Sequence, residues 1–425
     1  KYLTDYLGEN WQEDYYIWDC AAGTGNLLAG LTNKYNIYAS TLDQADVNVI
    51  HERIEHGANL LDNHVFQFDF LNDEFIPISK GGKMPDSLLF EIINEEKRKK
   101  LVVYINPPYA EADNRQGDGR SGVAISNIHK KYSSLMGYTK REMYVQFLTR
   151  IYCEIPQVVL ANFSKLKNLQ APKYSDFRSF FRAKLEKIFI TPANTFDNVK
   201  GQFPIGFFIW NTTKNEEFKH ITADLYEKNQ NYIGTKNIWA YDNVKFINDW
   251  VKTFRNTKSN SIATIIGVGS DFQNQRLVRF GEPFMKVPAS NHNWQTTKDN
   301  LCETSIYYTV RQIIQANWLN DRDQFLYPNE LWKSDNQFQN DCFTHCLFSN
   351  NISTSFGTNH WIPFTEYEVN AQAKFESSFM TDFIKGKIKA EPIGDTLFEN
   401  AEITENKPLE FSDEAKAVFD AGRAL

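Results

Sequence analysis

The sequence predicts an α/β protein whose N-terminal half folds as a mostly parallel sheet with helices on both faces. Strand-like and helix-like segments alternate through this half. A turn of small residues follows the first strand-like run, and polar residues end several of the others. Because a parallel strand needs a long crossover to reach its neighbour, this alternation favours a doubly wound arrangement.

The expected strands are short apolar runs. They cover residues 15–18, 36–42, 65–68, 100–105 and 157–161. Helices are expected to begin at Asn26 and to cover 46–55, where apolar residues recur at helical spacing. In a sheet of this kind, ligands bind beyond the carboxyl ends of the strands. We therefore expect one crevice to hold the polar residues that follow four of these strands, namely Asp19, Asp43, Asp69 and Asn106.

Two domains are expected. Residues 203–210 follow the run Ile188 to Ile190 and look like a hairpin that adds antiparallel strands at the sheet edge. The polar stretch after this hairpin is expected to hold the boundary, which gives domains of 1–213 and 214–425. The second domain is expected to be mixed and helix-containing, with helices over 304–319 and 371–384.

The composition is that of a soluble globular chain. Its 425 residues carry a formal net charge of −7, and 42% are hydrophobic. The sequence has no apolar run of about 18 residues and no secretory leader, so we expect no membrane span and a cytoplasmic location. Five scattered cysteines fit a reducing compartment. The segment Cys342 to Cys346 has no second ligand pair nearby, so no metal is expected.

Positive charge is concentrated in one part of this acidic sequence. Residues 106–190 contain 14 Lys and Arg against 7 Asp and Glu. Such a segment is either an ordinary solvated face or a surface for a polyanion.

The turn Asp19 to Asn26 (DCAAGTGN) is suited to binding a ligand through the backbone. Its glycines allow a close approach to the main chain, and the amides at the start of the following helix attract polar groups. A phosphate-binding loop would end in Gly-Lys-Ser/Thr, and a dinucleotide fingerprint would place a third glycine where Leu28 stands. A nucleoside with a zwitterionic tail, such as S-adenosylmethionine, remains as the expected ligand.

The tetrapeptide Asn106-Pro107-Pro108-Tyr109 predicts a specific chemistry. An amine attached to an aromatic ring is a poor nucleophile because its lone pair is delocalised. If the Asn106 side-chain oxygen and the Pro107 carbonyl each accept one of its N–H groups, the nitrogen becomes tetrahedral and can attack a methyl donor. The two prolines fix the backbone that aims these acceptors, and Tyr109 can stack on the ring.

These two motifs together resemble the amino-group DNA methyltransferases of the N6-adenine kind, which are common in restriction-modification systems. The resemblance runs through the first half of the chain and implies a Rossmann-like domain, with residues 203–210 as its antiparallel final hairpin and residues 214–425 as the target-recognition or partner-docking domain. It implies that S-adenosylmethionine is held by Asp19, Ala21, Gly23, Gly25, Asn26, Asp43, Asp69 and Phe70. An acidic residue commonly ends the second strand in this family; here Thr41 stands there, and Asp43 is the nearest acid.

The resemblance also implies double-stranded DNA as the substrate, with a specificity or nuclease subunit as a possible partner. Asn106, Pro107 and Tyr109 are the expected catalytic residues, and Tyr109, Tyr144 and Phe147 are expected to contact the flipped base. The cations expected to contact the DNA backbone are Arg115, Arg120, Lys130, Lys131, Lys140 and Arg141.

Two alternatives remain open at the level of sequence. The same tetrapeptide serves enzymes that methylate RNA bases or a protein glutamine, although the 212 residues after Thr213 favour an extended recognition surface. The chain can also be a DNA-binding protein or a modification-complex subunit without its own turnover.

Overall fold

The computed structural model describes residues 1–110, 125–196, 203–242, 244–255, 260–287, 292–354 and 357–359. The chain forms two compact units, Lys1–Asp242 and Asn243–Leu425, each with its own hydrophobic core. The helix expected over 371–384 lies outside the described residues. Within the described ranges, none of the helices has the length and apolar character needed to cross a bilayer.

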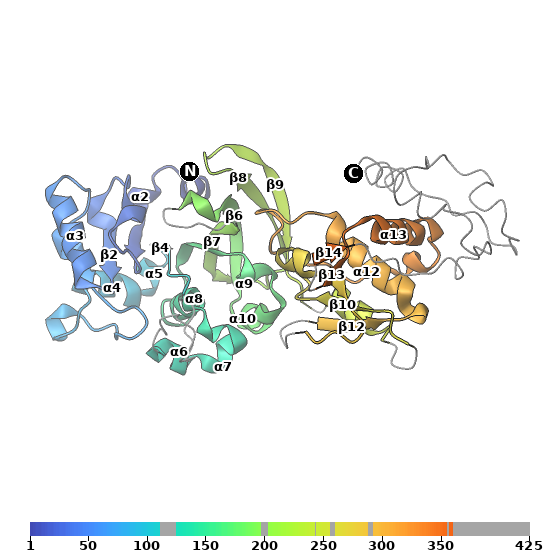
Figure 1. The fold of residues 1–425 in the computed structure, drawn as a ribbon. Helices are drawn as coiled ribbons and strands as arrows, with labels where there is room; N and C mark the ends of the chain where they lie inside the picture. The colour runs from blue at the N-terminus through green and yellow to red at the C-terminus, as the bar shows by residue number, and fades with distance from the viewer. Residues whose placement is uncertain are drawn as a thin grey trace, which may run out of the picture. The chain divides into compact units, whose positions relative to one another are not determined.

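A nine-stranded sheet forms the centre of the first unit (Figure 1). Its strand order is β3-β2-β1-β4-β5-β7-β6-β8-β9. Neighbouring strands from β3 to β5 are parallel, whereas β7 is antiparallel to both of its neighbours. The strands are β1 (Tyr16–Asp19), β2 (Ile37–Thr41), β3 (Val65–Gln67), β4 (Leu101–Ile105), β5 (Val159–Lys165), β6 (Ala183–Pro192), β7 (Pro204–Asn215), β8 (His220–Tyr226) and β9 (Tyr232–Trp239).

Helices cover both faces of the parallel part of the sheet, as the alternating sequence pattern predicts. Successive strand residues point to opposite faces. Ile17 of β1 belongs to the core that helix α3 (Gln44–Glu55) completes with Ile50. Its neighbour Trp18 packs on Phe70, which stacks on Phe147 of helix α8 (Met143–Glu154).

The other helices of the first unit are short. They are α1 (Tyr2–Leu7), α2 (Trp11–Asp14), α4 (Asp86–Ile93), α5 (Glu95–Arg98), α6 (Asn127–Lys131), α7 (Ser133–Met136), α9 (Lys167–Gln170) and α10 (Ser175–Phe180). Single 3₁₀ turns that the site uses are η1 (Asn26–Leu28), η5 (Gly137–Arg141), η6 (Pro172–Tyr174) and η7 (Ala193–Thr195).

The expected antiparallel hairpin of the run Ile188 to Ile190 with residues 203–210 is confirmed by the pairing of β6 with β7, but its expected position at the sheet edge is wrong. Strand β7 lies between β5 and β6, and β8 and β9 extend the sheet beyond them. The physical reason is the burial of β7, because every residue from Pro204 to Trp210 is buried and such a strand needs a neighbour on each side. Strand β9 alternates exposed and less exposed residues in part, as expected of an edge strand.

The expected domain boundary after residue 213 falls inside strand β7, so the division at Asp242 and Asn243 replaces it. The polar residues Thr213 to Asn215 therefore continue a strand rather than forming a linker.

The second unit contains a five-stranded sheet in the order β12-β10-β11-β13-β14. Its elements are β10 (Ala263–Gly267), β11 (Arg279–Gly281), β12 (His292–Thr296), β13 (Ile352–Thr354), β14 (Gly357–Asn359), α11 (Ile247–Lys252), α12 (Leu301–Ile313) and α13 (Asn336–Phe348). The helix expected over 304–319 is α12, which begins and ends earlier. It follows a capping box in which Thr297 and Asn300 bond reciprocally.

Candidate active site at the carboxyl edge of the sheet

The parallel strands bring the ends of β1, β2, β3 and β4 to one edge of the sheet. Asp19 pairs with Ala39 of β2, and β1 also pairs with β4, whose last residue Ile105 precedes Asn106. Asp43 and Asp69 each follow the end of their own strand by two residues. The backbone therefore places all four polar residues at the same edge, as the sequence predicts.

The glycine turn after β1 is a compact loop. The Ala22 amide donates to the Ser40 carbonyl over 3.0 Å, and the Gly25 amide donates to the Ala22 carbonyl over 2.8 Å. Gly25 has φ of +81°, and a Cβ atom there would lie 3.3 Å from Ile50 Cγ1. The helix expected from Asn26 is only the 3₁₀ turn η1, because the chain turns extended at Ala29. The loop therefore presents fewer free backbone amides pointing in one direction than the first turn of an α-helix would.

Asp19 is a buried carboxylate with an incomplete set of partners. Its Oδ1 accepts a 3.0 Å hydrogen bond from the Ala21 amide, while Oδ2 is buried and has no hydrogen-bond donor among the described residues. Burial raises the pKa of Asp19 to about 7. A buried carboxylate without a cation is unfavourable, so this position favours a ligand that carries positive charge.

The other predicted donor-binding residues have local partners. Both Asp69 oxygens accept bonds from its own turn, from the Leu71 amide at 3.0 Å and from Asn72 Nδ2 at 2.7 Å. The Asn26 side-chain oxygen accepts a 2.6 Å bond from Arg53. Asp43 is exposed at the start of α3, and its carboxylate does not cap the helix.

An acid that the sequence argument passed over lies near the end of β2. The Thr41 hydroxyl donates to Asp46 Oδ2 over 3.3 Å, and Asp46 is in the first turn of α3. Asp46 lies inside the helix, five residues after Thr41, so a search for an acid directly after the strand does not find it.

Asn106 and Tyr109 are hydrogen-bonded to each other. The Tyr109 hydroxyl donates to Asn106 Oδ1 over 2.7 Å, so the acceptor that the predicted chemistry needs is already in use. Burial raises the pKa of Tyr109 well above its usual value, which keeps the hydroxyl protonated and able to donate. The Lys165 ammonium lies 5.9 Å from the centroid of the Tyr109 ring. Pro107 is buried, whereas Asn106 and Tyr109 are partly exposed.

The residues predicted to contact the base, Tyr144 and Phe147, and the predicted donor-binding residue Phe70 are buried in this structure, and their contact with a ligand stays a prediction. Tyr144 is fully buried and its hydroxyl donates to the Tyr174 hydroxyl over 3.0 Å. Phe147 stacks on Phe70 with ring centroids 5.0 Å apart, and the two residues are only 6% and 2% exposed. The reason is that α8 is buried at every position from Tyr144 to Ile151, so its aromatic residues serve the core.

A buried arginine that the sequence did not single out holds the turn after β3. Arg150 Nη2 donates to the Asp73 carbonyl over 2.8 Å, and Nη1 donates to the Phe70 carbonyl. Glu154 balances its charge through a 2.8 Å ion pair. Arg150 therefore fixes the backbone that carries Asp69, a role that depends on long-range contacts with no local sequence signal.

Phe196 is a second residue that the sequence argument missed. Strand β6 ends at Pro192, η7 follows, and the Phe196 ring lies 5.3 Å from that of Phe163. Phe163 follows Asn162, which pairs with Ile105 just before Asn106. An aromatic side chain from the β6–β7 connection thus lies on the Asn106 side of the sheet edge.

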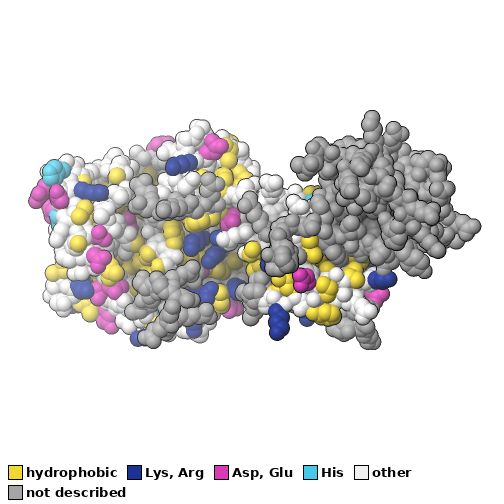
Figure 2. Space-filling view, in the orientation of Figure 1, with side chains coloured by type: hydrophobic (Ala, Val, Ile, Leu, Met, Phe, Trp, Pro, Cys, Tyr) yellow, Lys and Arg dark blue, Asp and Glu magenta, His cyan; other side chains and the backbone are white. Residues whose placement is uncertain are grey.

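Cations gather around the same edge. Figure 2 shows Lys and Arg side chains grouped on the first unit, in the region of α8 and α9. Of the predicted backbone contacts, Lys130 is exposed, Lys131 is paired with Glu154 at 2.6 Å, and Lys140 donates to Ser133 over 3.0 Å. The predicted contacts Arg115 and Arg120 lie outside the described residues.

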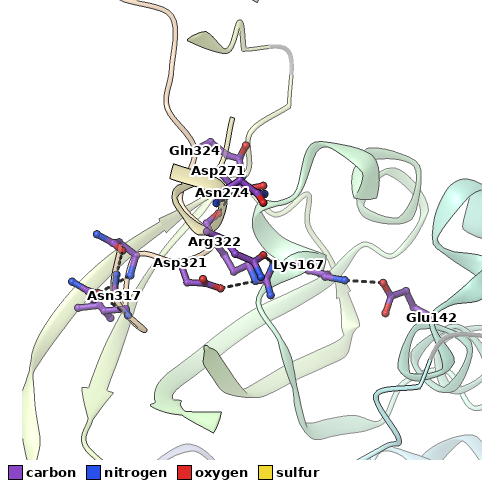
Figure 3. Close-up of polar contacts among 11 residues, drawn as sticks. Glu142, Lys167, Asp271, Asn274, Asn317, Asp321, Arg322 and Gln324 are labelled. Atoms are coloured by element: carbon purple, nitrogen blue, oxygen red, sulfur yellow. Dashed lines mark hydrogen bonds and ion pairs between the residues drawn. The ribbon is translucent and has the colours of Figure 1, made fainter. Parts of the chain in front are cut away.

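One ion pair joins the segments on either side of strand β5. Lys167 of α9 lies 3.0 Å from Glu142, the residue before α8, as Figure 3 shows. The Met143 amide donates to the Ala110 carbonyl over 3.1 Å. The start of α8 is therefore tied to the residue that follows Tyr109.

No family model and no curated protein matches this chain. Among solved structures, a DrdV–DNA complex is 15% identical over 56% of this chain and 26% of that chain, with a TM-score of 0.37. The DNA-bound ATP-dependent Type ISP restriction-modification enzyme LlaBIII is 13% identical over 63% of this chain and 23% of that one, also with a TM-score of 0.37. A type I restriction-modification methyltransferase subunit from Streptococcus thermophilus is 19% identical over 52% and 44%, with a TM-score of 0.35. The chain spans less than half of each, and these scores are too low to bear on its function.

Proposed function

We propose that this chain transfers a methyl group from S-adenosylmethionine to the N6 amine of adenine in double-stranded DNA. The observation that carries the proposal is the position of the Asn106-Pro107 acceptors at the end of β4, directly beside the strand that ends in buried Asp19. One strand end offers oxygen acceptors for an aromatic amine, and its neighbour offers a carboxylate that favours a cationic ligand.

The residues after β1 fit the methyl donor. Asp19 Oδ2 lacks a partner among the described residues, and a positively charged group of the donor would supply one. Gly23 has open space where a Cβ would stand, so the loop backbone is accessible. Asp43 or Asp46, at the start of α3, would hold the ribose hydroxyls. The donor supplies an electrophilic methyl group on a sulfonium sulfur.

The chain's own residues would orient the base and accept hydrogen bonds from its amine. Asn106 Oδ1 and the Pro107 carbonyl would accept the two N–H groups of the amine and hold its lone pair free for attack. Tyr109 would first release Asn106 Oδ1, because the hydroxyl and the amine compete for the same oxygen. The Tyr109 ring, and Phe196 from the far side of β5, would pack against the base.

The wider assignments belong to the same proposal. Duplex DNA is the favoured substrate because chemistry on a base amine requires a flipped nucleotide and a basic surface for the flanking backbone. A restriction-modification role, a specificity or nuclease partner and target recognition by residues 243–425 follow from the family resemblance. The Asn-Pro-Pro-Tyr segment also suits an amine in RNA or a protein glutamine, so these substrates are tested beside DNA.

The test is transfer of radiolabelled methyl from S-adenosylmethionine by the full chain. Duplex DNA, transfer RNA and a glutamine-containing peptide are compared, and the product nucleoside is identified by mass spectrometry. We expect N6-methyladenine from duplex DNA, and none from the Asn106→Ala variant. Label in RNA or peptide alone would overturn the DNA assignment. DNA binding without donor binding would instead identify a non-catalytic subunit.

A further inference from the structure

A tyrosine with two cations against its ring lies beside the candidate active site. The Arg141 guanidinium is 4.3 Å from the centroid of the Tyr138 ring, and the Lys173 ammonium is 4.8 Å from it. Tyr138 is 42% exposed, and its hydroxyl accepts a hydrogen bond from Arg141. We call Tyr138, Arg141 and Lys173 the Tyr138 cluster.

The Tyr138 cluster carries two positive charges that no carboxylate in the described part of the chain balances. The stretch 125–176 contains eight Lys and Arg against three Asp and Glu. Glu142 and Glu154 are already paired with other cations. The third acid, Asp176, lies against Gly137 and forms no ion pair with either cation within the residues that the structure describes.

A bound anion would stabilise this arrangement further. Each cation–π contact at an exposed ring contributes about 0.5–1 kcal/mol, and the two like charges repel each other. A phosphate group would be attracted to both. The planar Arg guanidinium can bind two phosphate oxygens at once, and the Lys ammonium adds a mobile point charge. The chemistry of the Tyr138 cluster is therefore that of a phosphodiester site.

Its place in the fold connects this site to Asn106. Arg141 ends η5, which leads directly into α8, and the start of α8 is bonded to Ala110. Lys173 lies in η6, which follows β5 by way of α9. Both segments thus lie at the carboxyl edge of the sheet, and the Lys167–Glu142 ion pair joins them (Figure 3).

We propose that the Tyr138 cluster binds a backbone phosphate of the DNA strand whose base enters the site beside Asn106. This inference rests on the proposed function for the identity of the substrate. It adds Tyr138 and Lys173 to the backbone contacts that the sequence predicts.

The experiment measures binding of a fluorescent random-sequence duplex to the full chain over a range of salt concentrations, without methyl donor. Each phosphate contact contributes about 0.9 to the slope of log K against log salt. The double variant Arg141→Ala/Lys173→Ala is expected to lower that slope by about 0.9 and to weaken binding roughly tenfold at 0.1 M salt. Arg141→Lys, which keeps the charge, is expected to keep the slope.

The matched control is Lys99→Ala/Lys214→Ala, which removes two charges at the opposite edge of the sheet. Both lysines are exposed and paired, Lys99 with Glu96 and Lys214 with Glu186, each at 2.7 Å. The control is expected to keep the wild-type slope. An equal loss in both double variants, or none in either, would overturn the proposal, as would tighter binding of transfer RNA than of the duplex.

The single variant Lys173→Glu reverses an exposed charge and distinguishes a loss of DNA binding from a loss of folding. Circular dichroism checks that this variant is folded. The variant is expected to weaken duplex binding at least as much as the double variant. Wild-type affinity in folded Lys173→Glu would also overturn the proposal. The binding assay needs no turnover. If the chain methylates no substrate but its duplex binding still depends on the Tyr138 cluster, the proposed function is refuted and the phosphate site is supported.

Discussion

The Tyr109 hydroxyl donates a 2.7 Å hydrogen bond to Asn106 Oδ1, the atom that the proposed reaction uses as an acceptor. The base amine and the tyrosine therefore compete for one oxygen. A hydrogen bond of this kind is worth about 1 kcal/mol net, which is small enough for an incoming substrate to replace.

Tyr109→Phe is expected to relieve this competition. The ring that packs against the base remains, while the donor that occupies Asn106 Oδ1 is lost. We expect KM for duplex DNA to fall by up to about fivefold, with kcat changed by a smaller factor. Steady-state methylation kinetics measure both values. A fall of kcat by orders of magnitude would mean that the hydroxyl itself takes part in the reaction.

Asn106→Ala is expected to abolish methylation while leaving donor binding intact. The substitution removes one of the two acceptors that hold the amine, and losing one such group typically costs about 100-fold or more in rate. Calorimetry with S-adenosylmethionine and the methyl-transfer assay give the two readouts. Lys99→Ala, at the other edge of the sheet, is the control. Turnover within tenfold of wild type would contradict the assignment.

Donor binding is expected to strengthen as pH rises through about 7, because Asp19 ionises there. The charged carboxylate attracts a cationic ligand, and the neutral acid does not. Asp19→Asn is expected to bind the donor weakly at all pH values and to lose this dependence. Calorimetric titrations below and above pH 7 test it, and a wild-type affinity independent of pH would count against the role of Asp19.

The same carboxyl is expected to shape stability. The pKa of Asp19 is higher in the folded chain than in the unfolded chain. At a pH between these two pKa values, the folded state therefore holds a proton that the unfolded state has released. The free energy of unfolding of the ligand-free chain should therefore fall as pH rises from about 4 to 7, by roughly 4 kcal/mol at most from this group. Asp19→Asn should remove that slope in urea unfolding of the first unit. An identical slope in wild type and variant would refute this.

Gly25→Ala is expected to destabilise the loop after β1 more than Gly81→Ala does. The two glycines have φ of +81° and +80°, so each alanine costs about 1–2 kcal/mol of backbone strain. Only at Gly25 does the new Cβ approach another side chain, Ile50, at 3.3 Å. Unfolding midpoints measure the difference, and donor affinity should fall in Gly25→Ala alone. Equal effects on affinity would show that the loop geometry is not specific to the ligand.

Local patterns in the sequence were sufficient for the parallel half of the sheet. Continuous apolar runs such as Leu101 to Ile105 report burial on both faces, and Asp19 and Asn106 stand where those runs stop. The edge on which they meet then follows from the parallel strand direction. The same patterns do not decide the role of Phe147, which is buried here, because an aromatic residue at helical spacing has the same signature in a core as at a ligand site.

The sequence by itself determined the bounds of β1 to β4 to within one residue and which polar groups follow them, because these depend on residues close together in the chain. Only the tertiary structure decided that β7 inserts between β5 and β6, that Arg150 holds the turn bearing Asp69, and that Arg141 and Lys173 share one ring. These features join segments far apart in the sequence. Their energies depend on which surfaces meet after folding, and no local periodicity encodes that.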